Sequence, residues 1–155
     1  MLEDRGELLF FDASCLVAAA ASSTGGSRFL LELCAKGYYR AVVSEPVLME
    51  TEFNVTRKLP DEALRAFHGF LASTPMIVAP VPRAGELRSV RGAVSRKDEH
   101  VVAAACASGA RYFLTLDRPL AAAVNARAEF FMAASTPGEF IRNELPKHPD
   151  FPSGR

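Results

Sequence analysis

Short, continuous apolar runs recur along the chain, each bounded by polar or turn-forming residues. Runs of this kind are typical of strands that are buried on both faces, as in parallel sheets. Between the runs, apolar residues recur at helical spacing. Strands that alternate with helices predict an α/β fold, with a central parallel sheet of about five strands flanked by helices. The predicted strands cover residues 8–11, 41–43, 76–78, 112–114 and 130–132.

Capping residues predict where several helices begin. The first two helices are expected over residues 15–21 and 29–35, and a helical pattern over residues 97–108 ends at Gly109. Four hydroxyl side chains mark expected helix starts along the chain, because each can accept a hydrogen bond from the first helical turn. These caps are Ser14, Ser27, Ser44 and Thr136.

Length and composition are those of a single globular domain. The chain has 155 residues, of which 49% are hydrophobic and 23% charged. We expect one domain over residues 1–145, followed by a flexible tail over residues 146–155 that is rich in proline. Eighteen basic residues balance eighteen acidic ones, so binding to RNA or to an anionic membrane would need a local patch.

The cysteines and the amino terminus indicate the cellular compartment in which we expect the protein. Cys15, Cys34 and Cys106 form no CxxC pair, which argues against a disulfide framework or a structural zinc site and favours a reducing cytoplasm. The chain starts with an acidic segment that lacks the features of a signal peptide, and no apolar run is long enough to span a membrane. We therefore expect a cytoplasmic protein without a membrane partner.

Four carboxylates stand at predicted strand ends or near predicted helix starts: Asp12, Glu50, Asp98 and Asp117. Asp12 follows the first strand, and Asp117 follows the fourth strand in the same way. If these two strands are neighbours where the strand order reverses, their loops leave a crevice that holds both acids. Carboxylates that gather in a crevice repel one another unless a proton or a cation neutralises them.

A set of oxygen ligands without histidine or cysteine favours a hard cation, Mg²⁺ or Mn²⁺, over zinc. One or two such ions can activate water for in-line attack on a phosphodiester bond. The alternative is that the four acids are separate helix caps or solvated positions. Glu52 and Glu99 compete for the same roles, but Glu99 should face away from the crevice if Asp98 faces into it, because one helical step turns a side chain by about 100°.

Other side chains near these acids are candidates for positioning the carboxylates or for binding a substrate phosphate. Ser14 and Thr115 could donate hydrogen bonds to an active-site carboxylate or to bound water, with plain capping as the alternative. Arg118, next to Asp117, is the best single candidate for a contact with a substrate phosphate. The arginine-rich stretch over residues 83–97 could bind phosphates or could be a solvated face.

At these residues the sequence resembles the PIN domain family, the metal-dependent nuclease fold that VapC-type toxins of toxin–antitoxin pairs share. The quoted segments run in family order and together cover roughly residues 7–145. They are Phe10-Phe11-Asp12-Ala13-Ser14, Ser44 through Glu50, Lys97-Asp98-Glu99-His100, Leu114-Thr115-Leu116-Asp117-Arg118 and Thr136-Pro137-Gly138-Glu139-Phe140.

The resemblance implies a three-layer fold with the strand order 3-2-1-4-5. It implies a Mg²⁺ or Mn²⁺ site at Asp12, Glu50, Asp98 and Asp117, endonucleolytic cleavage of RNA, and frequent homodimers. A cognate antitoxin would place a basic side chain among the acids and cover an apolar groove. Membership alone does not establish toxicity, because the family also includes processing and quality-control nucleases.

Two other classes of function remain open at this stage. One is a PIN-like module that binds RNA or a partner protein without cutting. The other is a receiver-like domain that is phosphorylated on an aspartate. The receiver is the weaker alternative, because the chain lacks the adjacent acids after the first strand and the late lysine that receivers use.

Overall fold

The computed structural model of the protein describes residues 7–151. In this part of the chain, five parallel strands form one sheet in the order β3-β2-β1-β4-β5, as the resemblance implied. Their apolar residues form continuous runs because both faces of the sheet are covered by helices. The strands are β1 (Leu8–Phe11), β2 (Arg40–Ser44), β3 (Met76–Ala79), β4 (Tyr112–Leu114) and β5 (Ala133–Ser135).

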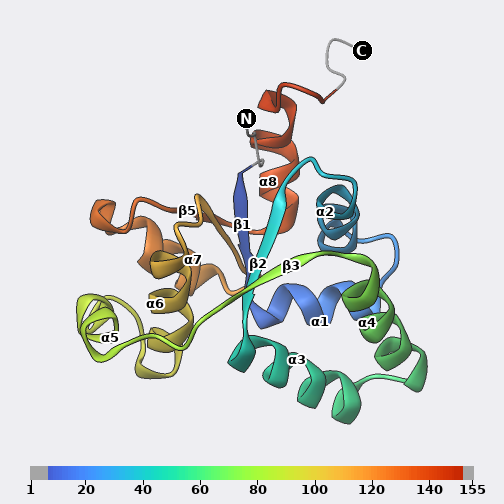
Figure 1. Ribbon diagram of the computed structural model, residues 1–155, viewed down its shortest axis with the longest axis horizontal. Helices are drawn as coiled ribbons and strands as arrows, with labels where there is room; N and C mark the ends of the chain where they lie inside the picture. Colours follow the sequence, from blue (N-terminus) through green and yellow to red (C-terminus); the bar gives the residue numbers. More distant parts are fainter. Residues whose placement is uncertain (1–6, 152–155) are drawn as a thin grey trace.

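Helices on both faces of the sheet complete a three-layer α/β/α architecture, with α1, α2 and α4 on one side and α5, α6 and α7 on the other (Figure 1). The helices are α1 (Ala13–Ala21), α2 (Gly26–Ala35), α3 (Glu45–Lys58), α4 (Asp61–Ser73), α5 (Ala84–Val90), α6 (Glu99–Ser108), α7 (Arg118–Asn125) and α8 (Pro137–Asn143). Within residues 7–151 there are also three short 3₁₀ helices: η1 (Arg96–Asp98), η2 (Ala128–Phe130) and η3 (Leu145–Lys147). No helix within residues 7–151 has the length and apolar character that crossing a membrane requires.

The core lies around the two central strands. Phe10 of β1 and Phe113 of β4 are paired in register, fully buried and stacked with their ring centroids 5.7 Å apart. The same register pairs Phe11 with Leu114, so the next residues along both strands, Asp12 and Thr115, emerge side by side. The strand order reverses between β1 and β4, and ligands of open α/β sheets bind at the carboxyl ends of the strands at such a point.

The fifth strand lies three residues later than the sequence pattern predicted. We expected residues 130–132, but Phe130 ends η2 and Phe131 adopts a left-handed backbone with φ 54°. Apolar periodicity reports which side chains are buried, and Phe130 and Met132 are indeed buried without being in a strand. The edge strand is instead fixed by the amide of Asn125, which donates to the Ala134 carbonyl and accepts from the Ala134 N–H, both at 2.8 Å.

Two predicted helix caps were wrong. The first helix starts at Ala13 and is capped by Asp12, because the Asp12 carboxylate reaches the first free N–H group of the helix. The second helix starts at Gly26 after Gly25 and has no side-chain cap, because the Ser27 side chain is buried rather than turned back over the helix end. The caps at Ser44 and Thr136 are confirmed, and Gly109 closes α6 with φ 80°.

The chain stays packed beyond residue 145, where we expected the flexible tail to begin. The His148 Nε2 lies 2.7 Å from the Tyr38 carbonyl oxygen, and the His148 ring packs on Tyr39. Because the ring nitrogen Nδ1 of His148 accepts the N–H of Asp150 at 3.0 Å, Nε2 carries the proton and is the donor to Tyr38. Residues 152–155 of the expected tail lie outside the described residues.

Candidate functional site

A cavity of about 410 Å³ opens at the carboxyl ends of β1 and β4. All four acids that the sequence singled out line it, although they come from four different segments of the chain. Two lysines line it with them, so the cavity combines both signs of charge. The six charged side chains are Asp12, Glu50, Lys58, Lys97, Asp98 and Asp117.

Asp12 is held in place by three hydrogen bonds. Its Oδ1 accepts the Ala13 N–H at 2.9 Å, which caps α1, and its Oδ2 accepts the hydroxyls of Thr115 at 2.7 Å and Ser14 at 3.3 Å. Burial raises the pKa of the Asp12 carboxyl, and the negative charge of Asp98 adds to the rise, whereas the three hydrogen bonds oppose it. The carboxylate is therefore rigid, partly desolvated and close to a second negative charge.

Thr115 and Ser14 connect the two central loops. The fully buried Thr115 hydroxyl donates to Asp12 and accepts the Asp117 N–H at 3.1 Å. The Ser14 hydroxyl likewise donates to Asp12 and accepts the Leu116 N–H at 3.0 Å. Each hydroxyl thus ties the loop after β1 to the loop after β4, a geometry that fixes the position of Asp12 relative to Asp117.

Asp117 and Asp98 are positioned by helix starts. Asp117 caps α7, with its Oδ1 accepting the Leu120 N–H at 3.1 Å, so its other oxygen has no role in the cap. Asp98 precedes α6 but makes no capping bond; its Oδ2 accepts the Ser95 hydroxyl at 2.9 Å, and its Oδ1 lies 3.9 Å from the Lys97 ammonium. Capping therefore accounts for one oxygen of Asp117 and for neither oxygen of Asp98.

Glu50 lies on α3 and reaches the cavity from its outer rim, where its side chain is exposed. Glu52 and Glu99, the two other acids considered for these roles, do not line the cavity. Glu52 is exposed and lies 3.5 Å from His68 on α4. Glu99 is buried on another face of α6, with its Oε1 3.8 Å from Arg96. The rotation of the helical backbone over two positions separates Glu50 from Glu52, and its rotation over one position separates Asp98 from Glu99.

Asn54 and Lys58, which the sequence pattern did not single out, also line the cavity. They follow Glu50 at intervals of four residues along α3, so all three side chains share one helical face. This spacing could have identified both residues once Glu50 was placed in the site. The ammonium groups of Lys58 and Lys97 give the acidic cavity a positive rim.

The donors that line the cavity are carboxylate oxygens, which suit Mg²⁺ or Mn²⁺. Among residues 7–151, however, no three His, Cys, Asp or Glu side chains stand close enough together to form a ready-made metal-ligand group. The four acids therefore share one cavity without forming such a group among the described residues. The chemistry of the donor set fits a hard cation, and burial together with the Asp98 charge raises the pKa of Asp12, so its ionised form is disfavoured without a cation.

Arg118 does not line this cavity. Its Nη1 donates to Glu139 Oε2 at 2.9 Å, and its side chain is 71% exposed. Glu139 in turn closes a capping box with Thr136 at the start of α8. A contact between Arg118 and a substrate phosphate stays a prediction, and it would compete with this ion pair.

A family model described as PIN domain matches residues 9–119, which is well over half of the chain and includes all four acids. The chain belongs to the PIN domain family. This assignment agrees with the strand order of the sheet and with the placement of the acids at its carboxyl edge. No sequence among curated proteins matches this PIN domain.

Two solved structures share the fold of this PIN domain. One is VapBC2 from Rickettsia felis, bound to a DNA fragment from its promoter, with a TM-score of 0.60, 18% identity, and coverage of 83% of this chain and 98% of that chain. The other is PAE2754 from Pyrobaculum aerophilum, with a TM-score of 0.58, 22% identity, and coverage of 88% of this chain and 96% of that chain. Identities this low establish a common fold and leave the activity of this chain to its own residues.

Proposed function

We propose that this PIN domain is a Mg²⁺- or Mn²⁺-dependent endoribonuclease. The observation that carries the proposal is the convergence of Asp12, Glu50, Asp98 and Asp117 on one cavity at the point where the strand order reverses. Four acids from four segments are costly to gather unless they bind a cation. Membership of the PIN domain family supports nuclease chemistry as the use of that cation.

In this proposal the four acids have two roles. Asp12, Asp98 and Asp117 would hold the ion, and Glu50 would either hold it or orient the attacking water from the exposed side of the cavity. When bound, the ion lowers the pKa of the attacking water and offsets the negative charge that develops on the phosphate. Ser14 and Thr115 keep the Asp12 oxygen in position, and Lys58 and Lys97 attract the phosphate backbone to the rim.

Cleavage of a fluorescently labelled single-stranded RNA tests the proposal. The purified protein should cut the RNA when Mg²⁺ or Mn²⁺ is added, and excess EDTA should stop the reaction. Asp12→Asn keeps the shape of the side chain and the cap of α1 but removes the charge, so it should lower the cleavage rate at least about 100-fold while the circular dichroism spectrum stays unchanged. Asp61→Asn, an exposed acid in the first turn of α4, is the matched control.

Metal-independent cleavage, or full activity of Asp12→Asn, would reject this assignment. The second candidate is a module that binds RNA without cutting it, and the two lysines in the cavity favour it over other non-catalytic functions. In that case the RNA would bind and remain intact with every metal tested. The same assay therefore separates the two candidates.

A role as the toxin of a toxin–antitoxin pair is part of the proposal. The fold shared with the Rickettsia felis VapBC2 structure supports it. The surface beside the acids supports it too, because α3 exposes Met49 and Phe53 one turn apart next to Glu50, with exposed fractions of 65% and 59%. An antitoxin segment could cover these apolar side chains while a basic side chain enters the cavity. We also propose a homodimer, which light scattering of the purified chain would test.

The cytoplasm is the proposed compartment. All three cysteines are free, and Cys15 and Cys34 are buried among apolar side chains. Burial raises the pKa of the Cys34 thiol to about 12, so this thiol stays protonated and unreactive at neutral pH. Free thiols of this kind suit a reducing environment.

A further inference from the structure

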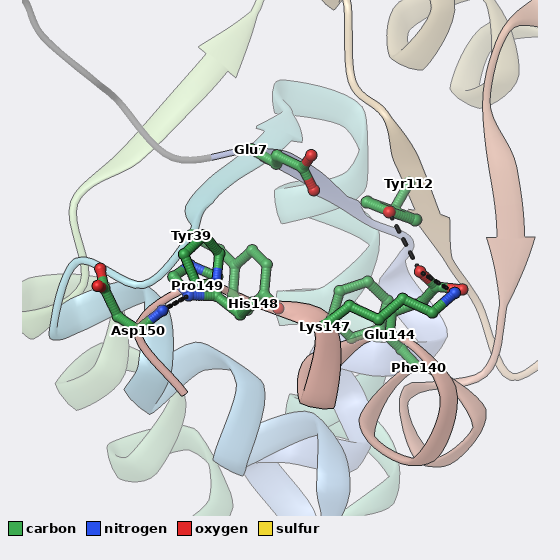
Figure 2. A pocket seen from close by; sticks show the side chains of 9 residues that line it. All are labelled: Glu7, Tyr39, Tyr112, Phe140, Glu144, Lys147, His148, Pro149 and Asp150. Atoms are coloured by element: carbon green, nitrogen blue, oxygen red, sulfur yellow. Dashed lines mark hydrogen bonds and ion pairs between the residues drawn. The ribbon is translucent and has the colours of Figure 1, made fainter. Parts of the chain in front are cut away.

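A second cavity, of about 540 Å³, lies at the amino ends of the strands, whereas the acidic site lies at their carboxyl ends. It is formed where β1, β2 and β4 begin and where α8 ends, and Figure 2 shows the side chains around it. Because the strands are parallel, their amino ends are separated from the acidic cavity by the length of the sheet. The side chains that matter here are Glu7, Tyr39, Tyr112, Phe140, Glu144 and His148.

One wall of this cavity is a continuous set of aromatic rings. The Phe140 ring packs edge to face with Tyr39, at 5.4 Å and 73°, and with Tyr112, at 4.9 Å and 82°. His148 extends the wall from the other side of Tyr39, at 4.9 Å and 75°. The faces of aromatic rings carry negative electrostatic potential and attract cations that can shed water, such as guanidinium and alkylammonium groups.

The charged residues around this wall are mostly acidic. Glu7, Glu144 and Asp150 line the cavity, and Lys147 is the basic side chain that lines it with them. Lys147 lies 3.7 Å from Glu144 and is 73% exposed, and Arg111 lies 3.7 Å from Glu7 and is 63% exposed. Exposed ion pairs of this kind are weak, so an incoming cation could displace either basic group from its carboxylate.

The Tyr39 hydroxyl adds a polar group that has no hydrogen-bond partner within the described residues. The Tyr39 side chain is only 3% exposed, yet within residues 7–151 its hydroxyl makes no hydrogen bond. Burial raises the pKa of Tyr39 to about 12, and the nearby Glu7 and Tyr112 add to the rise. Buried polar groups normally have a partner, so the geometry leaves one hydrogen-bonding position in the cavity for a ligand.

Arg111 already makes the two kinds of contact that a cationic ligand would make here, one with an aromatic ring and one with a carboxylate. Its guanidinium carbon lies 5.9 Å from the centre of the Tyr112 ring, and its Nη1 faces Glu7. We propose that this cavity binds an organic cation that carries a guanidinium or alkylammonium group, which would contact the Tyr39–Phe140–Tyr112 rings and pair with the Glu7 or Glu144 carboxylate. The volume suits a small molecule or one long basic side chain. The site is independent of the proposed nuclease activity.

Tyrosine fluorescence tests the proposal directly on the full chain. The chain has no tryptophan, and its three tyrosines all lie at this cavity: Tyr39 and Tyr112 line it, and Tyr38 packs on His148 at 5.3 Å. Titration with N-acetyl-arginine methyl ester should give a saturable change in fluorescence. N-acetyl-citrulline methyl ester, which has the same shape but a neutral urea group, should bind at least about tenfold more weakly.

Substitutions separate the site from nonspecific binding. Glu144→Gln keeps the acceptor for the Tyr112 hydroxyl but removes the charge, so it should weaken binding of the arginine ester about threefold to tenfold. Glu129→Gln removes an exposed acid that does not line the cavity and should leave the affinity unchanged. Equal binding of the two esters, or equal effects of the two substitutions, would overturn the proposal.

The same guanidinium chemistry could come from the chain itself, because Arg5 precedes Glu7 by two positions and lies outside the described residues. Arg5→Gln distinguishes this source from an added ligand. If the chain supplies the cation, the arginine ester should bind several-fold more tightly to Arg5→Gln than to the wild type. If the ligand is external, both should bind it equally. Absence of saturable binding to both proteins would reject the site.

Discussion

The Thr115 hydroxyl donates a 2.7 Å hydrogen bond to Asp12 Oδ2 across 103 positions of the sequence. This bond forms because β1 and β4 are neighbours and are paired so that Phe11 lies beside Leu114. Thr115 also accepts the Asp117 N–H, so one buried hydroxyl aligns two of the four acids. The geometry of the acidic cavity therefore depends on the side chain that follows β4 as much as on the acids themselves.

Replacing Thr115 should affect both stability and cleavage. Thr115→Val removes the hydroxyl at constant shape and leaves a buried carboxylate oxygen and an N–H group without this partner. We expect it to lower the free energy of unfolding by about 1–3 kcal/mol and the cleavage rate at least about tenfold. Urea denaturation and the RNA assay measure the two effects. Thr115→Ser keeps the hydroxyl, so it should recover most of the activity, and failure to do so would argue against a positioning role.

A divalent ion should stabilise the fold through the acidic cavity. At an Mg²⁺ or Mn²⁺ concentration of ten times the dissociation constant, binding contributes about 1.4 kcal/mol, which for a chain of this size raises the Tm by roughly 3–6 °C. Asp12→Asn should abolish most of this shift, and Asp61→Asn should retain it. Differential scanning calorimetry measures the shift without any substrate. An equal shift in both variants would place the ion elsewhere.

Glu50 and Glu52 form a matched pair on α3. Both are exposed, but only Glu50 lines the cavity. Glu50→Gln should lower the rate of RNA cleavage at least about tenfold, because it removes a carboxylate from the ion or the attacking water. Glu52→Gln should leave the rate within about twofold of the wild type, since it breaks only an exposed pair with His68. The reverse order of effects would reject the proposed role of Glu50.

Glu139 should stabilise the start of α8 in a pH-dependent way. The hydrogen bond from the Thr136 N–H lowers the pKa of the Glu139 carboxyl, and the hydrogen bond from Arg118 lowers it further. A carboxyl whose pKa is lower in the folded state contributes stability above its ordinary pKa of 4.5, and this contribution is lost as the pH falls through the folded value.

Glu139→Gln therefore should lower the Tm at pH 7, and the difference from the wild type should shrink as the pH falls below 4.5. Glutamine can still accept the Thr136 N–H, so the change isolates the effect of the charge. Thermal melts between neutral and acidic pH measure the difference. A difference that does not depend on pH would mean that the charge of Glu139 has no such effect.

The sequence by itself determined the fold class and the identity of the four acids. The apolar runs at β1, β2 and β4 were readable because these strands are buried on both faces, which leaves a continuous hydrophobic signal. Asp12 and Asp117 stood out because each directly follows such a run. Helix caps with their own signatures, Ser44 and Thr136, were also predictable because they depend on contacts within a few residues.

Tertiary structure decided the features that depend on distant partners. The start of β5 at Ala133 is set by pairing with Tyr112 and by the Asn125 amide, and local hydrophobicity does not report either. The first helix begins at Ala13, two residues before the predicted start at Cys15, because Asp12 caps it and the Ser14 hydroxyl accepts the Leu116 N–H of the neighbouring loop. The aromatic cavity around Tyr39 and Tyr112 had no sequence signal, because its walls come from strand ends and helices that only the folded sheet brings together.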